Sequence, residues 1–236
     1  MSIKICHLYP KHMSLYGDRG NIVVLSFLAE QIGIDLSLQD CYPGERIEPH
    51  SNIIFLGGGQ DNDQEKIVND ILQRKNEIAD LIANGCIFIG VCGGYQLLGT
   101  SYESASGHTL KGLDILDFYT LNSKKGEKRI IGNVVAFSEQ FGSLVGFENH
   151  GGRTFLKGQT PLAKVIQGGG NNANDTTEGL FQQYGNGHIL GTYLHGFLQK
   201  NPNVAKWLIK STCGYDYFLP DPIETLNLKT NMSLSY

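Results

Sequence analysis

The chain has 236 residues, of which 41% are hydrophobic, and this is enough to build the core of one α/β domain. With 19 basic and 23 acidic residues, its net charge of -4 excludes the basic excess that favours nucleic acid or an anionic membrane as a partner. No apolar stretch approaches the ~20 residues that span a bilayer, the N-terminus has no signal-peptide core, and no two of the cysteines form a C-x-x-C pair. We therefore expect a single cytoplasmic domain over residues 1–236, with reduced thiols, no metal and no membrane insertion.

The first half of the chain alternates short apolar runs with stretches whose apolar residues recur at helical spacing. The runs predict strands at residues 3–8, 34–38, 52–56 and 86–91, and the spacing predicts helices at residues 22–32 and 67–82. Strands that alternate with helices indicate a parallel sheet, so we expect an α/β fold.

The second half, from about Thr109, consists of shorter β-rich runs that are separated by Gly, Asn and Ser clusters. Strands are predicted at residues 110–116, 129–137, 144–148 and 162–167, then a buried strand at 188–193, a helix at 203–211 and a loosely patterned tail at 215–236. We expect these runs to form hairpins and an antiparallel extension of the parallel sheet.

Cys92 is the cysteine whose surroundings favour chemistry. It follows the buried run 86–91 and precedes Gly93, Gly94 and residues that can open a helix, so the order is strand, sharp turn, helix. Such a turn pushes the side chain out above the sheet edge, where the first N–H groups and the dipole of the next helix favour a thiolate. The alternative, a buried cysteine that only packs, does not explain the surrounding glycines. We therefore predict that Cys92 is a nucleophile.

A second glycine-rich loop, at residues 57–61, follows the strand predicted at 52–56. The backbone N–H groups of such a loop can bind a phosphate or hold an oxyanion. No Gly-Lys-Ser/Thr follows it and the chain has no Walker A pattern, so we expect no ATP site in this chain. Because neighbouring parallel strands end at the same sheet edge, we expect the loop to stabilise an oxyanion beside Cys92.

A cysteine nucleophile needs a base, and histidine is the usual one. His195 follows the strand predicted at 188–193, so in a parallel sheet it would emerge at the same edge as Cys92. His150, in the run FENHGGRT, is the rival, although a histidine that only holds a glycine turn is an equally good interpretation there. We favour His195.

Three motifs occur in the order of a known family: GGGQD at 57–61, GVCGGYQ at 90–96 and Tyr-x-His-Gly at 193–196. They resemble the motifs of the type 1 glutamine amidotransferases, in particular the branch typified by cobyric acid synthase. The runs LYPKHMSLYGDRGN, KRIIGN and GFENHGGRT resemble the glutaminase subunits of lipid II isoglutaminyl synthases. The resemblance covers most of the chain. It implies the flavodoxin-like, three-layer class I glutamine amidotransferase fold, with a mostly parallel central sheet and an antiparallel extension.

The resemblance implies hydrolysis of L-glutamine. Cys92 would attack the side-chain amide, ammonia would leave, and water would hydrolyse the γ-glutamyl thioester to glutamate. His195 would move the protons. Backbone N–H groups of Gly58, Gly59 and Gly93 would hold the oxyanion.

Substrate and partner also follow from the resemblance. Gln96 and Arg129 match substrate-binding positions, and a guanidinium can bind the α-carboxylate of glutamine bidentately. The chain itself would need no cofactor, and a separate Mur-ligase-like synthetase subunit would bind ATP and Mg and form a heterodimer with it. That subunit would amidate the D-glutamate α-carboxyl of lipid II during peptidoglycan synthesis. An amidotransferase for a corrinoid or another carboxylate, a non-catalytic regulatory module and a peptide-cleaving cysteine hydrolase remain alternatives.

The chain departs from the wider family directly after His195, where Gly-Phe replaces the Pro-Glu whose carboxylate orients the base. We therefore expect an acidic residue of the partner subunit to complete the triad, with Glu148 as the internal alternative. Asp18 and Arg153 are interpreted as a helix cap and a loop charge.

Overall fold

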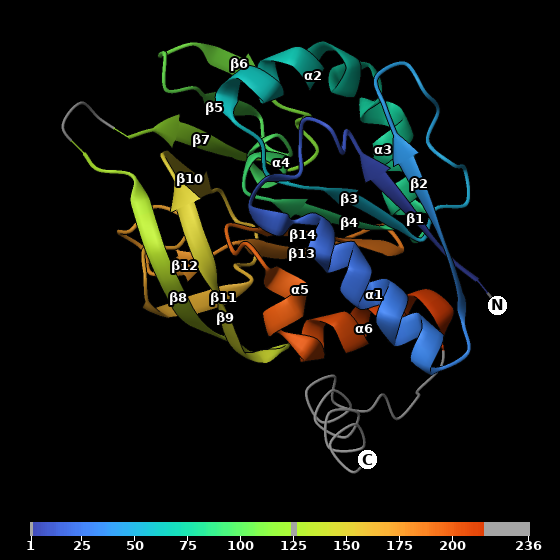
Figure 1. The fold of residues 1–236 in the computed structure, drawn as a ribbon. Coiled ribbons are helices and arrows are strands. Elements are labelled where there is room, and N and C mark those ends of the chain that lie inside the picture. The colour runs from blue at the N-terminus through green and yellow to red at the C-terminus, as the bar shows by residue number, and fades with distance from the viewer. Residues whose placement is uncertain (1, 124–126, 215–236) are drawn as a thin grey trace, which may run out of the picture.

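A six-stranded sheet forms the centre of the protein, seen in the computed structural model (Figure 1), which describes residues 2–123 and 127–214. The tail at 215–236 lies outside the described residues. The strand order is β13-β14-β4-β3-β1-β2; five neighbouring strands run parallel, and β13 pairs with β14 in the antiparallel direction. The strands are β1 (Ser2–Leu8), β2 (Asp35–Cys41), β3 (Ile53–Leu56), β4 (Ile87–Val91), β13 (Leu180–Tyr184) and β14 (Gly187–Thr192).

Helices cover both faces of this sheet and complete three layers (Figure 1). On one face lie α1 (Arg19–Gln31), α5 (Phe197–Lys200) and α6 (Pro202–Cys213), and on the other lie α2 (Asp61–Gln73) and α3 (Lys75–Ala83). Side chains of the central strands alternate between two cores: in β3, Phe55 packs in the core that contains α1, and Leu56 in the core that contains α2. The strands therefore read as continuous apolar runs because both of their faces are buried.

The helix predicted over residues 67–82 is two helices, because the chain bends at Arg74. This residue has φ -89° and ψ 0°, and it ends α2 and precedes α3. Its guanidinium is buried and donates to the Asp70 carboxylate at 2.6 Å, so the bend is held by an ion pair.

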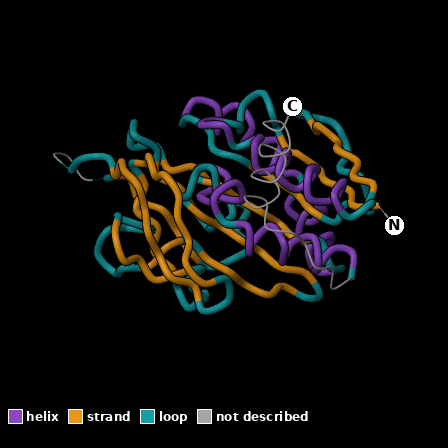
Figure 2. The backbone as a smooth tube through the Cα atoms, turned by 60° about the horizontal axis from the view of Figure 1, so that its bottom comes forward, coloured by secondary structure: helices purple, strands orange, loops and turns teal. Residues whose placement is uncertain are grey.

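Two smaller sheets stand beside the central one, on the side where strands gather in Figure 2. One has the order β10-β7-β5-β6 and the other β12-β11-β8-β9. The first contains β5 (Ser101–Glu103), β6 (Thr109–Lys111), β7 (Phe118–Asn122) and β10 (Gly152–Leu156), and the second β8 (Ile130–Ser138), β9 (Gly142–His150), β11 (Ala163–Gln167) and β12 (Thr177–Glu178). The predicted fold class, a mostly parallel sheet with an antiparallel extension, is confirmed: β13 joins the central sheet in the antiparallel direction, and the two smaller sheets are antiparallel except for the parallel pair β5–β7.

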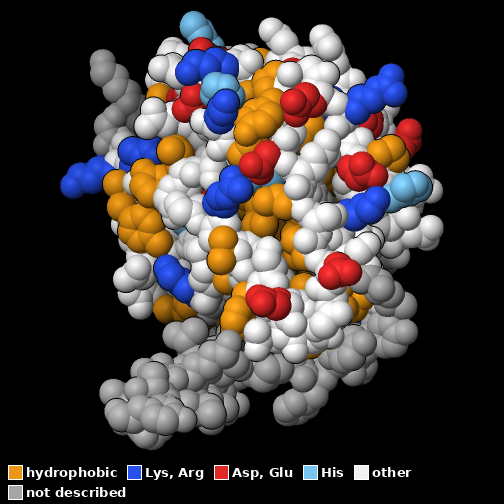
Figure 3. All heavy atoms as spheres, turned by 45° about the vertical axis from the view of Figure 1, so that its right-hand side comes forward, with side chains coloured by type: hydrophobic (Ala, Val, Ile, Leu, Met, Phe, Trp, Pro, Cys, Tyr) orange, Lys and Arg blue, Asp and Glu red, His pale blue; other side chains and the backbone are white. Residues whose placement is uncertain are grey.

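The surface mixes charges of both signs. On the face shown in Figure 3, Lys and Arg side chains are interspersed with Asp and Glu. In the part of the chain that the structure describes, no helix has the length and apolarity needed to cross a bilayer.

Candidate active site

Cys92 lies on a strained turn between β4 and the short helix α4 (Gly93–Gln96). Its φ of 51° and ψ of -108° fall outside the regions that non-glycine residues ordinarily occupy. The turn is packed tightly: a Cβ on Gly94 would lie 2.2 Å from the Leu56 carbonyl oxygen, so only glycine fits there. The Cys92 amide donates to the Thr192 carbonyl at 2.8 Å and ties the turn to the end of β14. The expected strand, sharp turn and helix are all present.

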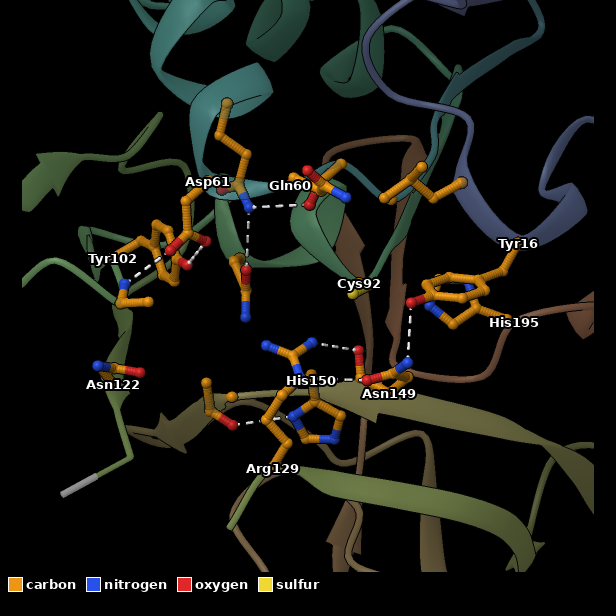
Figure 4. Close-up of a pocket in the computed structure, with 18 of the residues that line it drawn as sticks. Tyr16, Gln60, Asp61, Cys92, Tyr102, Asn122, Arg129, Asn149, His150 and His195 are labelled. Carbon is orange, nitrogen blue, oxygen red and sulfur yellow. Dashed lines mark hydrogen bonds between the residues drawn. The ribbon is translucent and has the colours of Figure 1, made fainter. Parts of the chain in front are cut away.

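His195 lies three residues beyond β14 and is held from two sides. Its main chain exchanges hydrogen bonds with Phe147 of β9, with the His195 amide donating at 2.8 Å. Its imidazole is 2% exposed, and a Cβ on Gly58 would lie 2.9 Å from His195 Cε1 and 3.3 Å from Cys92 Cβ. The Gly58 backbone thus lies close to both side chains, and Figure 4 shows Cys92 and His195 beside each other in the pocket.

Asp18 orients the imidazole, and this corrects two expectations from the sequence. Asp18 Oδ1 lies 3.0 Å from His195 Nδ1, and the carboxylate is fully buried. It makes no helix-capping bond with its side chain, although it directly precedes α1. The position that we assigned to an acid of the partner subunit is thus occupied by a residue of this chain.

Glu148, the internal alternative for the triad acid, lies elsewhere. Its carboxylate accepts hydrogen bonds from the Gly169 and Gly170 amides at 2.7 and 2.9 Å, and it lies 3.5 Å from His150 Nε2. These contacts fix a loop beside β9 and leave the orientation of His195 to Asp18.

The pKa of His195 is raised to about 10. Burial by itself lowers this pKa, but the hydrogen bond to Asp18, the charge of Asp18 and the interaction with the neighbouring Cys92 side chain more than offset it. The imidazole is therefore protonated near neutral pH. Among the described residues, His195 Nε2 is buried and has no hydrogen-bond partner, whereas Nδ1 is paired with Asp18.

The glycine loop after β3 only partly matches the expected oxyanion site. The Gly58 amide donates to Asp18 Oδ2 at 2.7 Å, so it is unavailable to an oxyanion, and its assignment as a donor is wrong. The Gly59 amide is placed differently. Its nitrogen would lie 3.1 Å from a Cβ built on Gly93, so it lies beside the start of α4. The two remaining predicted donors, Gly59 and Gly93, are therefore neighbours.

Cys92, His195 and Gly59 line a pocket of about 480 Å³ (Figure 4). Arg129 lies on the opposite side, where its Nε donates to Asn149 Oδ1 at 3.2 Å and its Nη2 to the Asn149 carbonyl at 3.0 Å. Gln96 also lines the pocket, but its amide already binds Gln64 and the Tyr193 hydroxyl within the wall. The structure thus brings all the sequence-predicted side chains to a single pocket.

His150, the rival base, lines the same pocket in a different environment. Its Nδ1 lies 2.9 Å from the Gly152 carbonyl, and its ring stacks on Tyr193 with 3.6 Å between centroids. Burial lowers its pKa. Since its nitrogens face Gly152 and Glu148, the geometry favours His195 as the partner of Cys92.

No sequence motif indicated Glu178, which lies close to the site. Glu178 is fully buried and its Oε1 accepts hydrogen bonds from the Thr192 hydroxyl and the Tyr193 amide, at 2.6 and 2.9 Å. Burial raises the pKa of Glu178 to about 7. It fixes the end of β14 just before His195.

Within the described residues, no group of His, Cys, Asp and Glu side chains could hold a metal ion.

Solved structures resemble this fold. The PurLQS structure from Thermotoga maritima matches with a TM-score of 0.60 and 16% identity, over 91% of this chain and 99% of that one. The glutaminase domain of the Trypanosoma brucei CTPS matches with a TM-score of 0.58 and 10% identity, over 93% and 97%. At these identities the likeness concerns the fold.

Sequence comparisons place the chain more narrowly. The model of the CobB/CobQ-like glutamine amidotransferase domain matches residues 4–203. The lipid II isoglutaminyl synthase (glutamine-hydrolyzing) subunit GatD of Streptococcus pneumoniae is 40% identical over 92% of this chain and 85% of that protein, and its Staphylococcus aureus counterpart is 38% identical over 89% and 84%. A probable cobyric acid synthase of Methanococcus maripaludis is 30% identical, but the match covers 38% of that protein.

The fold and the domain match together define an enzyme of the glutamine amidotransferase class. Within that class, the chain belongs to the CobB/CobQ-like glutamine amidotransferase family.

Proposed function

We propose that this chain hydrolyses L-glutamine to L-glutamate and ammonia and delivers the ammonia to a separate synthetase subunit. One observation carries the proposal: Cys92 on its strained turn meets a buried histidine that Asp18 holds protonated, in a pocket with a guanidinium on the far wall. Hydrolysis of the side-chain amide of an amino acid requires a nucleophile, a proton donor and a group that binds the α-carboxylate, and this pocket contains all three.

The reaction follows from the positions of these groups. The Cys92 thiolate attacks the side-chain carbonyl carbon, and the charge that develops on the oxygen is stabilised by the Gly59 and Gly93 amides. His195 gives its Nε2 proton to the nitrogen, the C–N bond breaks, and ammonia leaves a γ-glutamyl thioester. His195 then removes a proton from water, the hydroxide attacks the thioester, and glutamate and the thiolate are released with the proton back on His195.

Arg129 supplies substrate recognition in this proposal. Its guanidinium lies across the pocket from Cys92 and suits the α-carboxylate of glutamine, because two parallel N–H groups match two carboxylate oxygens. Gln96, whose amide is fixed by Gln64 and Tyr193, shapes the wall along the substrate side chain.

The names of the relatives support the choice of acceptor. Two relatives at 40% and 38% identity are subunits of lipid II isoglutaminyl synthase, so we place this chain in a heterodimer with a Mur-ligase-like synthetase in the cytoplasm. That partner would bind ATP and Mg and amidate the D-glutamate α-carboxyl of lipid II to D-isoglutamine. A cobyrinate-type acceptor is the second candidate, favoured by the 30% identity to a probable cobyric acid synthase.

Ammonia release from L-glutamine by the purified chain tests the first half of the proposal. We expect release by the wild type and its loss in Cys92→Ala, with Cys213→Ala, a change in the last turn of α6, as the matched control. Release that persists in Cys92→Ala would contradict the proposal.

A further inference from the structure

Asn149 joins the two sides of the pocket mouth. Its side-chain NH2 donates to the Tyr16 hydroxyl at 2.8 Å, while its Oδ1 accepts from Arg129 Nε at 3.2 Å and its carbonyl from Arg129 Nη2 at 3.0 Å (Figure 4). One residue near the end of β9 therefore connects the guanidinium on one wall with an aromatic ring from the N-terminal segment on the other.

The two bonds to Arg129 leave it in a defined orientation. They use Nε and one Nη2 hydrogen, which form one edge of the planar guanidinium. Asn149 does not use the Nη1–Nη2 edge. This edge presents the parallel pair of donors that a carboxylate binds bidentately. Arg129 is otherwise an exposed, long side chain, so among the described residues its bonds to Asn149 are what restrict its rotamers.

Tyr16 has an unusual position at the same mouth. Its ring lies against the His195 imidazole, with 4.8 Å between centroids, and yet 55% of the residue is exposed. Its φ of 52° and ψ of 29° are left-handed, a conformation that costs a tyrosine roughly 1–2 kcal/mol. Something must hold the ring over the nearly buried His195, and the bond from Asn149 does so.

We propose that Asn149 is a positioning residue that couples recognition of the substrate carboxylate at Arg129 to closure of Tyr16 over His195. This inference rests on the proposed glutamine hydrolysis at the same pocket. A carboxylate on the Nη1–Nη2 edge fixes the guanidinium, the guanidinium fixes Asn149, and Asn149 fixes the Tyr16 hydroxyl. An amide that lacks the α-carboxylate leaves the mouth less ordered, so selection for an amino acid amide depends on Asn149 and on the hydroxyl of Tyr16.

Covalent capture of Cys92 by 6-diazo-5-oxo-L-norleucine tests the coupling in the full chain. This glutamine analogue keeps the α-carboxylate; its diazo carbon takes up a proton, N2 leaves, and the thiolate forms a thioether, which intact mass measures. The concentration dependence separates the half-saturating concentration from the maximal rate. We expect Asn149→Ala to raise the half-saturating concentration about tenfold, because Arg129 loses the bond from its Nε and keeps only the one from Nη2 to the backbone carbonyl. Tyr16→Phe keeps the ring and loses one hydrogen bond, so we expect about a threefold rise.

The double variant makes the test specific. If the Asn149–Tyr16 bond carries the effect of the hydroxyl, Tyr16→Phe adds nothing in the Asn149→Ala background. Asn133→Ala, on the exposed side of the neighbouring strand β8, is the matched control and leaves the capture unchanged. A half-saturating concentration in Asn149→Ala equal to that of the wild type would overturn the proposal. So would a threefold effect of Tyr16→Phe that persists without Asn149.

Iodoacetamide separates failure of this inference from failure of the proposed function. Iodoacetamide has no α-carboxylate and alkylates the Cys92 thiol directly. The fold-change that Asn149→Ala causes in the rate of this alkylation should therefore be smaller than the fold-change it causes in the half-saturating concentration of the diazo compound. Alkylation of wild-type Cys92 by iodoacetamide with no capture by the diazo compound would contradict glutamine recognition itself, and the coupling with it. Normal wild-type capture with no effect of Asn149→Ala would overturn the coupling alone.

Discussion

Asp18 is the residue on which the protonation of His195 depends. Burial lowers the pKa of this histidine, and the bond to Asp18 is the first of the contributions that raise it to about 10. We expect Asp18→Asn to lower the His195 pKa, because the hydrogen bond and the charge of Asp18 that raise it are removed, while the burial that lowers it stays. The imidazole Cε1–H resonance, followed by NMR against pH, measures the shift. Asp63→Asn, whose carboxylate pairs with Lys66, is the control.

The same substitution should weaken catalysis. An imidazole that has lost its orienting carboxylate is misoriented and readily neutral, and the same Asp→Asn change in a catalytic triad costs about 10⁴-fold in kcat. Glutamine hydrolysis by Asp18→Asn should therefore fall by about this factor with little change in KM. Activity within about threefold of the wild type would show that Asp18 does not orient His195 during the reaction.

The His195–Asp18 pair also predicts how stability depends on pH. The folded-state pKa of His195 lies above its unfolded value, so the contribution of the pair is fully present below about pH 6.5 and is lost as pH rises through about 10. The free energy of unfolding of the wild type should thus exceed that of Asp18→Asn by more at pH 6 than at pH 10.5. Urea unfolding at both values measures this, and a constant difference would contradict the assigned ion pair.

The turn between β4 and α4 sets the direction of the Cys92 side chain, and Gly94 allows this turn to pack directly against the backbone at the end of β3. A Cβ there would lie 2.2 Å from the Leu56 carbonyl oxygen and 2.8 Å from that of Gly57, both of them backbone atoms. We expect Gly94→Ala to lower the free energy of unfolding by about 1–3 kcal/mol and to displace Cys92. Gly132→Ala in β8, whose Cβ would meet nothing within 4 Å, should stay within about 0.5 kcal/mol of the wild type. Urea unfolding distinguishes the two.

The element scale also explains what the sequence could predict. Cys92 and His195 each follow a short, continuous apolar run, and parallel strands β4 and β14 end at one edge, so their meeting could be predicted from local patterns. Asp18 could not, because it lies 177 residues from His195 and a polar residue before a helix looks like a cap. The Gly58 amide was misassigned for the same reason: its partner is Asp18, which no local pattern connects to the loop.

Strands with distant partners were likewise harder to predict. β7 and β10 pair with each other across about 30 residues, and neither has a long apolar run of its own. β8 and β9 form a hairpin: β8 was predicted to within one residue at each end, and β9 extends two residues beyond its predicted range at both ends. Arg129 and Asn149 meet because that hairpin brings its two ends together, which the sequence pattern did not indicate.

At the scale of the whole molecule, the pocket is open to solvent, so ammonia made by the isolated chain would escape into it. Arg129, Tyr16 and Ile131 line the pocket and are exposed to solvent, so they mark the side on which it opens. A synthetase subunit that receives the ammonia would have to cover this mouth. The nitrogen source used by the assembled pair therefore tests the whole proposal.

We expect the chain, mixed with a Mur-ligase-like synthetase, to amidate lipid II when ATP, Mg and glutamine are supplied. The complex that carries Cys92→Ala should lose glutamine-dependent amidation and retain amidation driven by ammonium chloride, because only the source of ammonia is removed. Product formation followed by mass spectrometry separates the two nitrogen sources, and Cys213→Ala should support both. Glutamine-dependent product in the Cys92→Ala complex would contradict the nucleophile. Product from a corrinoid carboxylate but none from lipid II, with either nitrogen source, would instead favour the second acceptor.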